Sequence, residues 1–274
     1  MVSVADCVVL LTLAPVETHT GRRRHARMGP VPQAGHITKE KEAVQLDEEG
    51  QASSIPEILE QFPGREWSWA LEAFEYWGAP PTVRLYPSGC TTTQPVETGD
   101  GPYFVVVDGD LTSTTPVDLV TCDYTPGLVI VTGSLNAPLL YFANNIRVFV
   151  GGDVRVSGAC FGQLGDRNAM LTVEGELHAR ALILGSYAEV CADGGIRALV
   201  YAHGLDQLCP DIVRDGLGDD SRFFRPELLD HHENYPPILS VPAAVEAAFA
   251  GEELFLPGVE ERFPERLVLR RNSA

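Results

Sequence analysis

The segment His231-His232-Glu233 combines residue types that bind metal ions. A zinc site needs three or four such ligands that converge on one ion. Here the ligands are adjacent in one loop, and no further ligand follows at a spacing typical of zinc sites. His178 and His203, which lie in or beside apolar segments, do not complete a set of three. We therefore expect an exposed polar loop, without a metal ion or any other cofactor.

The common catalytic and nucleotide-binding motifs are absent from the sequence, including the nucleophile elbow, the Walker loop, the dinucleotide fingerprint and HExxH. Asp123, Asp153, Arg155 and Asp166 are candidates for catalysis on a carbohydrate, because they fall on outward positions of the repeat described below. That repeat is too short for a long substrate groove, so we expect no enzymatic activity. A small enzyme acting on carbohydrate or acyl groups is an alternative.

The charge balance restricts the partners of this chain. With 20 basic and 38 acidic residues, its net charge of −18 repels nucleic acid and anionic membranes. The segment from 206 to 265 holds fourteen acidic residues and four arginines. Within it, Asp215, Asp219 and Asp220 are our candidate contacts for a basic protein partner, since charge complementarity speeds association and selects partners. A solvated acidic surface without a partner is the alternative.

Cysteine usage and the N-terminal segment bear on the compartment. The six cysteines are widely spaced without a Cys-x-x-Cys pair, which favours reduced thiols over disulfides or a zinc cluster. The apolar run Cys7–Pro15 follows an acidic residue and precedes the basic run Arg22–Arg27, the wrong polarity for a secretory signal. We therefore expect a cytoplasmic protein, with Met28 as an alternative start.

A short glycine-containing pattern recurs through the middle of the chain and must position any site there. Its glycines are 24, 19, 23 and 19 residues apart, and they are Gly109, Gly133, Gly152, Gly175 and Gly194. A shift of 42 residues superimposes the segment 133–156 on 175–198. Such self-similarity at a fixed period is typical of solenoids.

The residues within one unit alternate as in a β-strand that has one buried face. Ile146, Val148 and Val150 point one way, and Arg147 and Phe149 point the other way. We therefore predict an all-β core that is a short, right-handed parallel β-helix. Leucine-rich repeats would need a recurrent Asn and a helical half, and left-handed hexapeptide helices would need a rhythm of six; neither pattern is present.

The β-helix is expected over residues 101–204, with α-helical caps on both flanks. Residues 1–52 are polar and expected to be disordered. Ser54, followed by Pro56 and Glu57, marks a helix start in an N-terminal cap over 53–100. Residues 205–274 are expected to form an acidic C-terminal cap with a short helix. Caps are expected because a coil stack exposes unpaired backbone groups at each end.

The rhythm VTGSLNA, VGGDVRVSG, VEGELHA and ADGGIRA, between Val131 and Ala198, resembles the coils of bactofilin-type, polymer-forming bacterial β-helix proteins. That resemblance covers the repeat only, and it implies nucleotide-free polymerisation into a scaffold. The irregular coil lengths and the long flanks depart from this family and argue against polymerisation. The chain also resembles other bacterial β-helix proteins, some of them associated with toxin–immunity loci.

Three functions remain at this point. The first is a non-enzymatic β-solenoid that binds another, basic protein in a scaffold or immunity role. The second is a bactofilin-like structural protein that polymerises through the ends of its helix. The third is the small enzyme mentioned above.

Overall fold

The structure is a computed structural model, and it describes residues 43–65, 67, 71, 74, 77–122, 124–163, 169–185, 188–202, 212–213, 219–263 and 268–269. The expectation of disorder over residues 1–42 therefore lies outside the described residues, as do the candidates Asp123, Asp166, His203 and Asp215.

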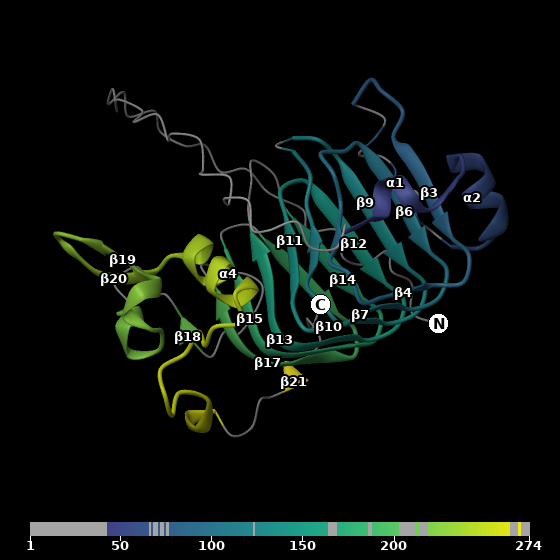
Figure 1. The fold of residues 1–274 in the computed structure, drawn as a ribbon. Helices are drawn as coiled ribbons and strands as arrows, with labels where there is room; N and C mark the ends of the chain where they lie inside the picture. The colour runs from purple at the N-terminus through teal and green to yellow at the C-terminus, as the bar shows by residue number, and fades with distance from the viewer. Residues whose placement is uncertain are drawn as a thin grey trace, which may run out of the picture. The chain divides into compact units, whose positions relative to one another are not determined.

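The described chain forms a parallel β-solenoid of about five turns, as the repeat predicts (Figure 1). One side of each coil belongs to a seven-stranded sheet, which we call the first side. Its strands are β2 (Gln51–Ala52), β3 (Thr82–Tyr86), β6 (Tyr103–Val107), β9 (Gly127–Val131), β12 (Ile146–Val150), β14 (Met170–Val173) and β16 (Glu189–Ala192). The hand of the coil stays a prediction.

A 12-stranded sheet makes the other two sides. The second side holds β4 (Cys90–Thr92), β7 (Leu111–Ser113) and β10 (Leu135–Ala137). The third side holds β1 (Val44–Gln45), β5 (Val96–Glu97), β8 (Val117–Leu119) and β11 (Leu140–Ala143). In the later coils both sides are built by long strands with a register shift between their halves: β13 (Val154–Gln163), β15 (Glu176–Leu184) and β17 (Gly195–Ala202).

Inward-pointing side chains form apolar columns that run through the coils. On the first side, the register aligns residues separated by the predicted 24, 19, 23 and 19 positions: Val107, Val131, Val150, Val173 and Ala192. On the second side, the column is Cys90, Leu111, Leu135, Val154, Leu177 and Ile196. Burial of each Val or Leu contributes about 1.5–3 kcal/mol before the entropy of ordering is subtracted.

The recurring glycines stack on one another at the corner between the first and second sides. The amide of each donates to the carbonyl of the glycine one coil earlier, at 2.8–3.0 Å, from Gly133 to Gly194. A Cβ on Gly175 would lie 2.6 Å from the Gly152 carbonyl oxygen, so a side chain does not fit there. The glycines therefore recur because neighbouring coils come into close contact at this corner, and they do not form a phosphate-binding loop.

The N-terminal boundaries in the structure differ from those expected. Strands β3, β4 and β5 pair in parallel with β6, β7 and β8, so the coils begin at Thr82 and not at 101. Gly89, which lies one coil length before Gly109, was the sequence signal for this earlier coil. A Cβ on Gly89 would lie 2.6 Å from the carbonyl oxygen of Asp110 in the next coil, so a side chain does not fit there either. Residues 44–52 are ordered as well: β1 pairs with β5, α1 (Leu46–Glu49) follows, and β2 pairs with β3.

The predicted helix start at Ser54 is confirmed, whereas a helical cap over the end of the stack stays a prediction. Helix α2 (Ile55–Gln61) begins with a capping box between Ser54 and Glu57. Ile58, Trp67 and Phe74 pack on the outer surface of the first side, against apolar residues of β3, β6, β9 and β12. Because that surface is apolar in four successive coils, it needs a lateral cover.

The C-terminal segment also packs laterally, on the outer surface of the third side. It contains the short turns η2 (Asp220–Arg222), η3 (Pro226–Leu228) and η4 (Glu260–Arg262), the hairpin β19 (Leu229–His232) and β20 (Tyr235–Leu239), and the predicted short helix α4 (Val241–Phe249). Its apolar residues cover outward side chains of β13, β15 and β17, such as Phe161 and Ile183. The strands β18 (Ile212–Val213) and β21 (Val268–Leu269) pair with the edge of β17.

Candidate functional site

The three outer surfaces of the solenoid differ in what covers them. The first and third sides present apolar residues that the flanks of the chain bury. The second side presents one polar side chain per coil, and none of these is buried: Thr91, Thr112, Asn136, Arg155, His178 and Arg197. We call this column the open face. Among the described residues, it is the side without an apolar outer cluster.

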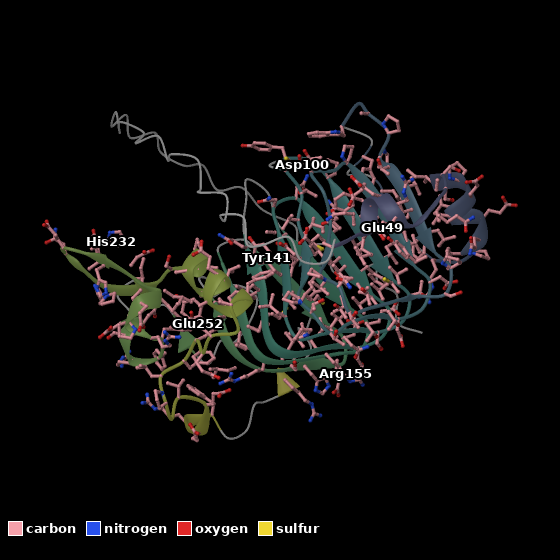
Figure 2. The ribbon with its side chains drawn as sticks, in the orientation of Figure 1. Glu49, Asp100, Tyr141, Arg155, His232 and Glu252 are labelled. Atoms are coloured by element: carbon pink, nitrogen blue, oxygen red, sulfur yellow. The ribbon has the colours of Figure 1, made fainter. Side chains whose placement is uncertain are left out.

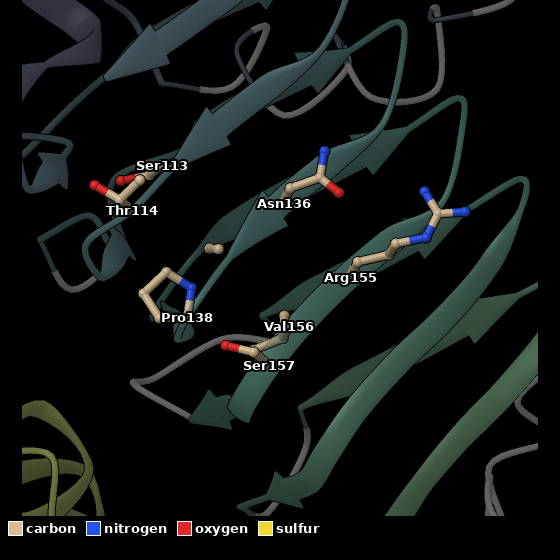
Figure 3. A pocket seen from close by; sticks show the side chains of 8 residues that line it. Ser113, Thr114, Asn136, Pro138, Arg155, Val156 and Ser157 are labelled. Atoms are coloured by element: carbon tan, nitrogen blue, oxygen red, sulfur yellow. The ribbon is translucent and has the colours of Figure 1, made fainter. Parts of the chain in front are cut away.

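A shallow groove of about 400 Å³ lies on the open face (Figure 3). It crosses β7, β10 and β13, and Figure 3 shows Asn136 and Arg155 side by side on neighbouring strands. Its lining is Ser113, Thr114, Asn136, Ala137, Pro138, Arg155, Val156 and Ser157. Figure 2 places Arg155 on the outside of the coils, away from Tyr141. Of the sequence candidates for carbohydrate chemistry, Asp153 and Arg155 therefore lie at this surface.

Carboxylates recur at one border of the open face, beside the stacked glycines. This border, which we call the acidic corner, consists of Asp108, Asp110, Asp153, Glu174, Glu176 and Asp193. Some of its carboxylates hold the coils together: Asp110 Oδ1 accepts from the Ser134 amide at 2.7 Å, and Asp153 Oδ1 accepts from the Glu176 amide at 2.9 Å. Asp110 and Asp153, each directly after a repeat glycine, therefore accept hydrogen bonds from backbone amides of the next coil.

Ion pairs neutralise part of the open face. Arg155, on β13, donates to Asp153, which directly precedes that strand. Glu176 lies 2.7 Å from the His178 Nε2 and 3.4 Å from the Arg197 Nε. The positive groups of the column are thus balanced by carboxylates of the acidic corner.

The residues predicted to contact a partner have other roles where the structure describes them. Asp215 lies outside the described residues. Asp219 accepts hydrogen bonds from Ser221 at the start of η2. Asp220 is 1 % exposed, so its prediction as a partner contact is wrong. Its Oδ2 accepts from the Tyr201 hydroxyl and from the Leu239 amide, both at 2.8 Å, and joins the C-terminal segment to the coils.

We expect Asp220→Ala to lower the free energy of unfolding by about 2 kcal/mol, because two buried donors would lose their acceptor. Chemical denaturation measures this change. Asp219→Ala is the matched control, and we expect a loss of about 0.5–1 kcal/mol from the missing cap. Equal losses in the two variants would contradict the assigned role of Asp220.

Arginines offset some of the acidic charge of the C-terminal segment. Arg180, on β15, donates to Glu260 at 2.9 Å and to Glu253 at 3.1 Å. The hydrogen bonds that Arg180 donates to Glu260 and, to a smaller extent, to Glu253 raise the pKa of Arg180. Arg225 pairs with Glu252 at 3.0 Å. The Arg180 contacts fasten the segment to the solenoid, whereas the Arg225 contact lies within the segment. Both reduce the acidic surface that the composition alone implies.

The residues considered first, His231 to Glu233, lie at the exposed end of the β19–β20 hairpin, which projects from the coils in Figures 1 and 2. In the part of the chain that the structure describes, three or more His, Cys, Asp or Glu side chains nowhere gather as a metal site would require. His178 is held by Glu176 on the open face and lies far along the chain from this hairpin.

Sequence reasoning missed one pair of acidic residues on the third side. Glu97 and Asp118 occupy directly paired positions on β5 and β8, and Tyr141 follows on β11. Asp118 Oδ1 is buried and accepts no hydrogen bond from the described residues. Burial, followed by the neighbouring Glu97 carboxylate, raises the pKa of Asp118 to about 7. The alternation of β5 and β8 would have shown both residues pointing outward, but only the register places them side by side.

The groove on the open face is thus open and its one charged side chain, Arg155, is paired, while the acid pair of Glu97 and Asp118 lies on another side. No protein-family model matches this chain, and neither a curated protein nor a solved structure is significantly similar to it.

Proposed function

We propose that the protein is a non-catalytic β-solenoid that binds a basic protein partner along the acidic corner, at the border of its open face. A β-solenoid fits a structural or binding role. The observation that supports this proposal is the unequal cover of the three sides: the chain buries two outer surfaces with its own flanks and leaves the polar one accessible. The bactofilin resemblance and a cytoplasmic location remain proposals beside it.

The acidic corner supplies the selectivity for a basic partner. Asp193 is exposed and without a side-chain partner among the described residues, and Glu174 makes only a long ion pair of 3.7 Å with Arg65. A row of carboxylates along the coil axis in a protein of net charge −18 attracts cationic surfaces and accelerates their encounter. This corner replaces the buried Asp220 as the proposed contact surface.

Self-polymerisation by coil stacking is less well supported. Growth of the solenoid would require parallel strands to add at both ends. Strand β2 runs antiparallel to β3 at the start of the stack, and β21 runs antiparallel to β17 at its end. These strands interrupt the parallel pattern that a further copy would continue. In light scattering, we expect a discrete particle at micromolar concentration, and filaments would contradict this expectation.

The described helices include none of the length and hydrophobicity that crossing a membrane takes.

The binding proposal is tested with Glu174→Lys/Asp193→Lys and with Glu246→Lys/Glu261→Lys as a control of equal charge on exposed positions of the C-terminal segment. We expect the wild type and the control to retain the same basic protein from a lysate of the native cell at low salt. We expect the corner variant to lose it by about tenfold or more, because attraction is replaced by repulsion. Retention by the corner variant, equal loss in the control, or capture of no basic protein would overturn the proposal.

A further inference from the structure

The groove on the open face holds several hydrogen-bonding groups without a partner among the described residues. Arg155 uses one terminal nitrogen for Asp153, which leaves its Nε and Nη1 donors available. Asn136 donates to Thr112 at 3.3 Å, which leaves its carbonyl oxygen as an acceptor. The hydroxyls of Thr114 and Ser157 make no side-chain hydrogen bond in the described part of the chain. Donors and acceptors therefore alternate within one groove.

The charge of the groove points to an uncharged ligand. Its single cation, Arg155, is paired with Asp153. The surrounding protein has a net charge of −18 and repels a polyanion, whereas a cationic ligand finds unpaired carboxylates at the acidic corner instead. A neutral molecule rich in hydroxyl groups can bond to both the donors and the acceptors of the groove, and it is not repelled by the charge of the protein.

The backbone of the groove excludes a peptide that would add as a strand. Strand β10 is paired on both edges, with β7 and with β13, so its backbone amides and carbonyls are already used. Side chains are the groups left for a ligand. They repeat at about 4.8 Å, the distance between neighbouring strands, which suits a chain of short polar units lying across the coils. Among the apolar residues of the lining, Pro138 is only half-buried, whereas the side chains of Ala137 and Val156 belong to the core inside the coils.

We infer that this groove is a binding site for a linear, neutral oligosaccharide. The hydroxyls of the sugar meet Asn136, Arg155, Thr114 and Ser157, and one of its apolar C–H faces lies on the Pro138 ring. This inference is independent of the proposed protein partner, which uses the acidic corner. No bond is made or broken, and the site holds its ligand by hydrogen bonds and contact alone.

The test is a titration of the full chain with cellohexaose, maltohexaose and chitohexaose, followed by heteronuclear NMR. We expect at least one of the three to shift the side-chain signals of Asn136 and Arg155. Arg155→Ala is expected to weaken binding about tenfold, a typical loss for a charge-assisted hydrogen bond. Ser157→Trp, which fills the groove and leaves the polar column in place, is expected to abolish binding.

Arg222→Ala is the control, because Arg222 is an exposed arginine on the C-terminal segment. It should bind as the wild type does. Failure of all three sugars to bind at about 10 mM, the weak end of specific affinities, would overturn the inference. So would unchanged binding by both groove variants, or equal binding of hexagalacturonate, which carries a carboxylate on each unit. The corner variant described above should keep sugar binding, so that the two proposals fail separately.

Discussion

Asp118→Asn should make the protein more stable at pH 8 than the wild type, by up to about 4 kcal/mol, and should leave its stability nearly unchanged at pH 4. The pKa of Asp118 is raised to about 7 by burial and by Glu97, from an ordinary value of 3.8. Each unit of difference corresponds to 1.36 kcal/mol, so the upper limit is about 4 kcal/mol.

The direction of this pH dependence follows from which state, folded or unfolded, holds the proton of Asp118. Between about pH 4 and pH 7 the folded state keeps the proton of Asp118, whereas the unfolded state has lost it. Since the folded state binds more protons, the free energy of unfolding falls as the pH rises through this window. Above pH 7 the folded protein contains a charged carboxylate whose Oδ1 is buried and lacks a donor among the described residues. Asn at this position carries no charge at any pH, so the cost is absent.

Denaturant unfolding at pH 4 and pH 8 measures this effect, and carbon-detected NMR follows the Asp118 carboxyl directly. Asp230→Asn, on the exposed β19, controls for the loss of one negative charge from an acidic protein. Glu97→Gln should lower the midpoint of the Asp118 titration, because it removes the neighbouring charge. A titration midpoint near 4 in the wild type would refute the assignment.

Gly175→Ala should lower the free energy of unfolding by about 3 kcal/mol, although the change adds one methyl group. Its Cβ would clash with Asp153 Oδ1 and would lie 2.6 Å from the Gly152 carbonyl oxygen. The second contact is with backbone, which can move only if the hydrogen bond of 3.0 Å between the two glycines is broken. Overpacking of this kind costs about 1–3 kcal/mol, and the rigid neighbour places the change at the upper end.

Gly185→Ala is the matched control within the same coils. The Gly185 amide also bonds to a glycine one coil earlier, Gly162, at 2.8 Å. There the added Cβ would meet its nearest atom at 3.5 Å, an ordinary contact. We expect a change within about 1 kcal/mol, with some stabilisation from a less flexible unfolded chain. If both variants unfold at the same denaturant concentration, close coil contact does not explain the glycine repeat.

The amino-acid sequence by itself determined the solenoid. Inward and outward positions alternate with a period of two, and each coil repeats the last, so local pattern and long-range pairing carry the same information. The column from Val107 to Ala192 follows directly from the glycine spacings. The capping box at Ser54 is also local, since its two partners are three residues apart.

Tertiary structure alone decided what lies outside the coils. The flanks pack on lateral surfaces because Phe149 on the first side and Phe161 on the third are outward apolar residues that must be covered, and the sequence does not state which segment covers them. The sequence predicts Asp220 to be a surface charge. In the structure, Tyr201 and Leu239, both 19 residues away in the chain, donate hydrogen bonds to it. The partnership of Glu97 with Asp118 depends on strand register in the same way. Burial and charge at these positions are set by contacts between distant residues, and no periodic pattern encodes them.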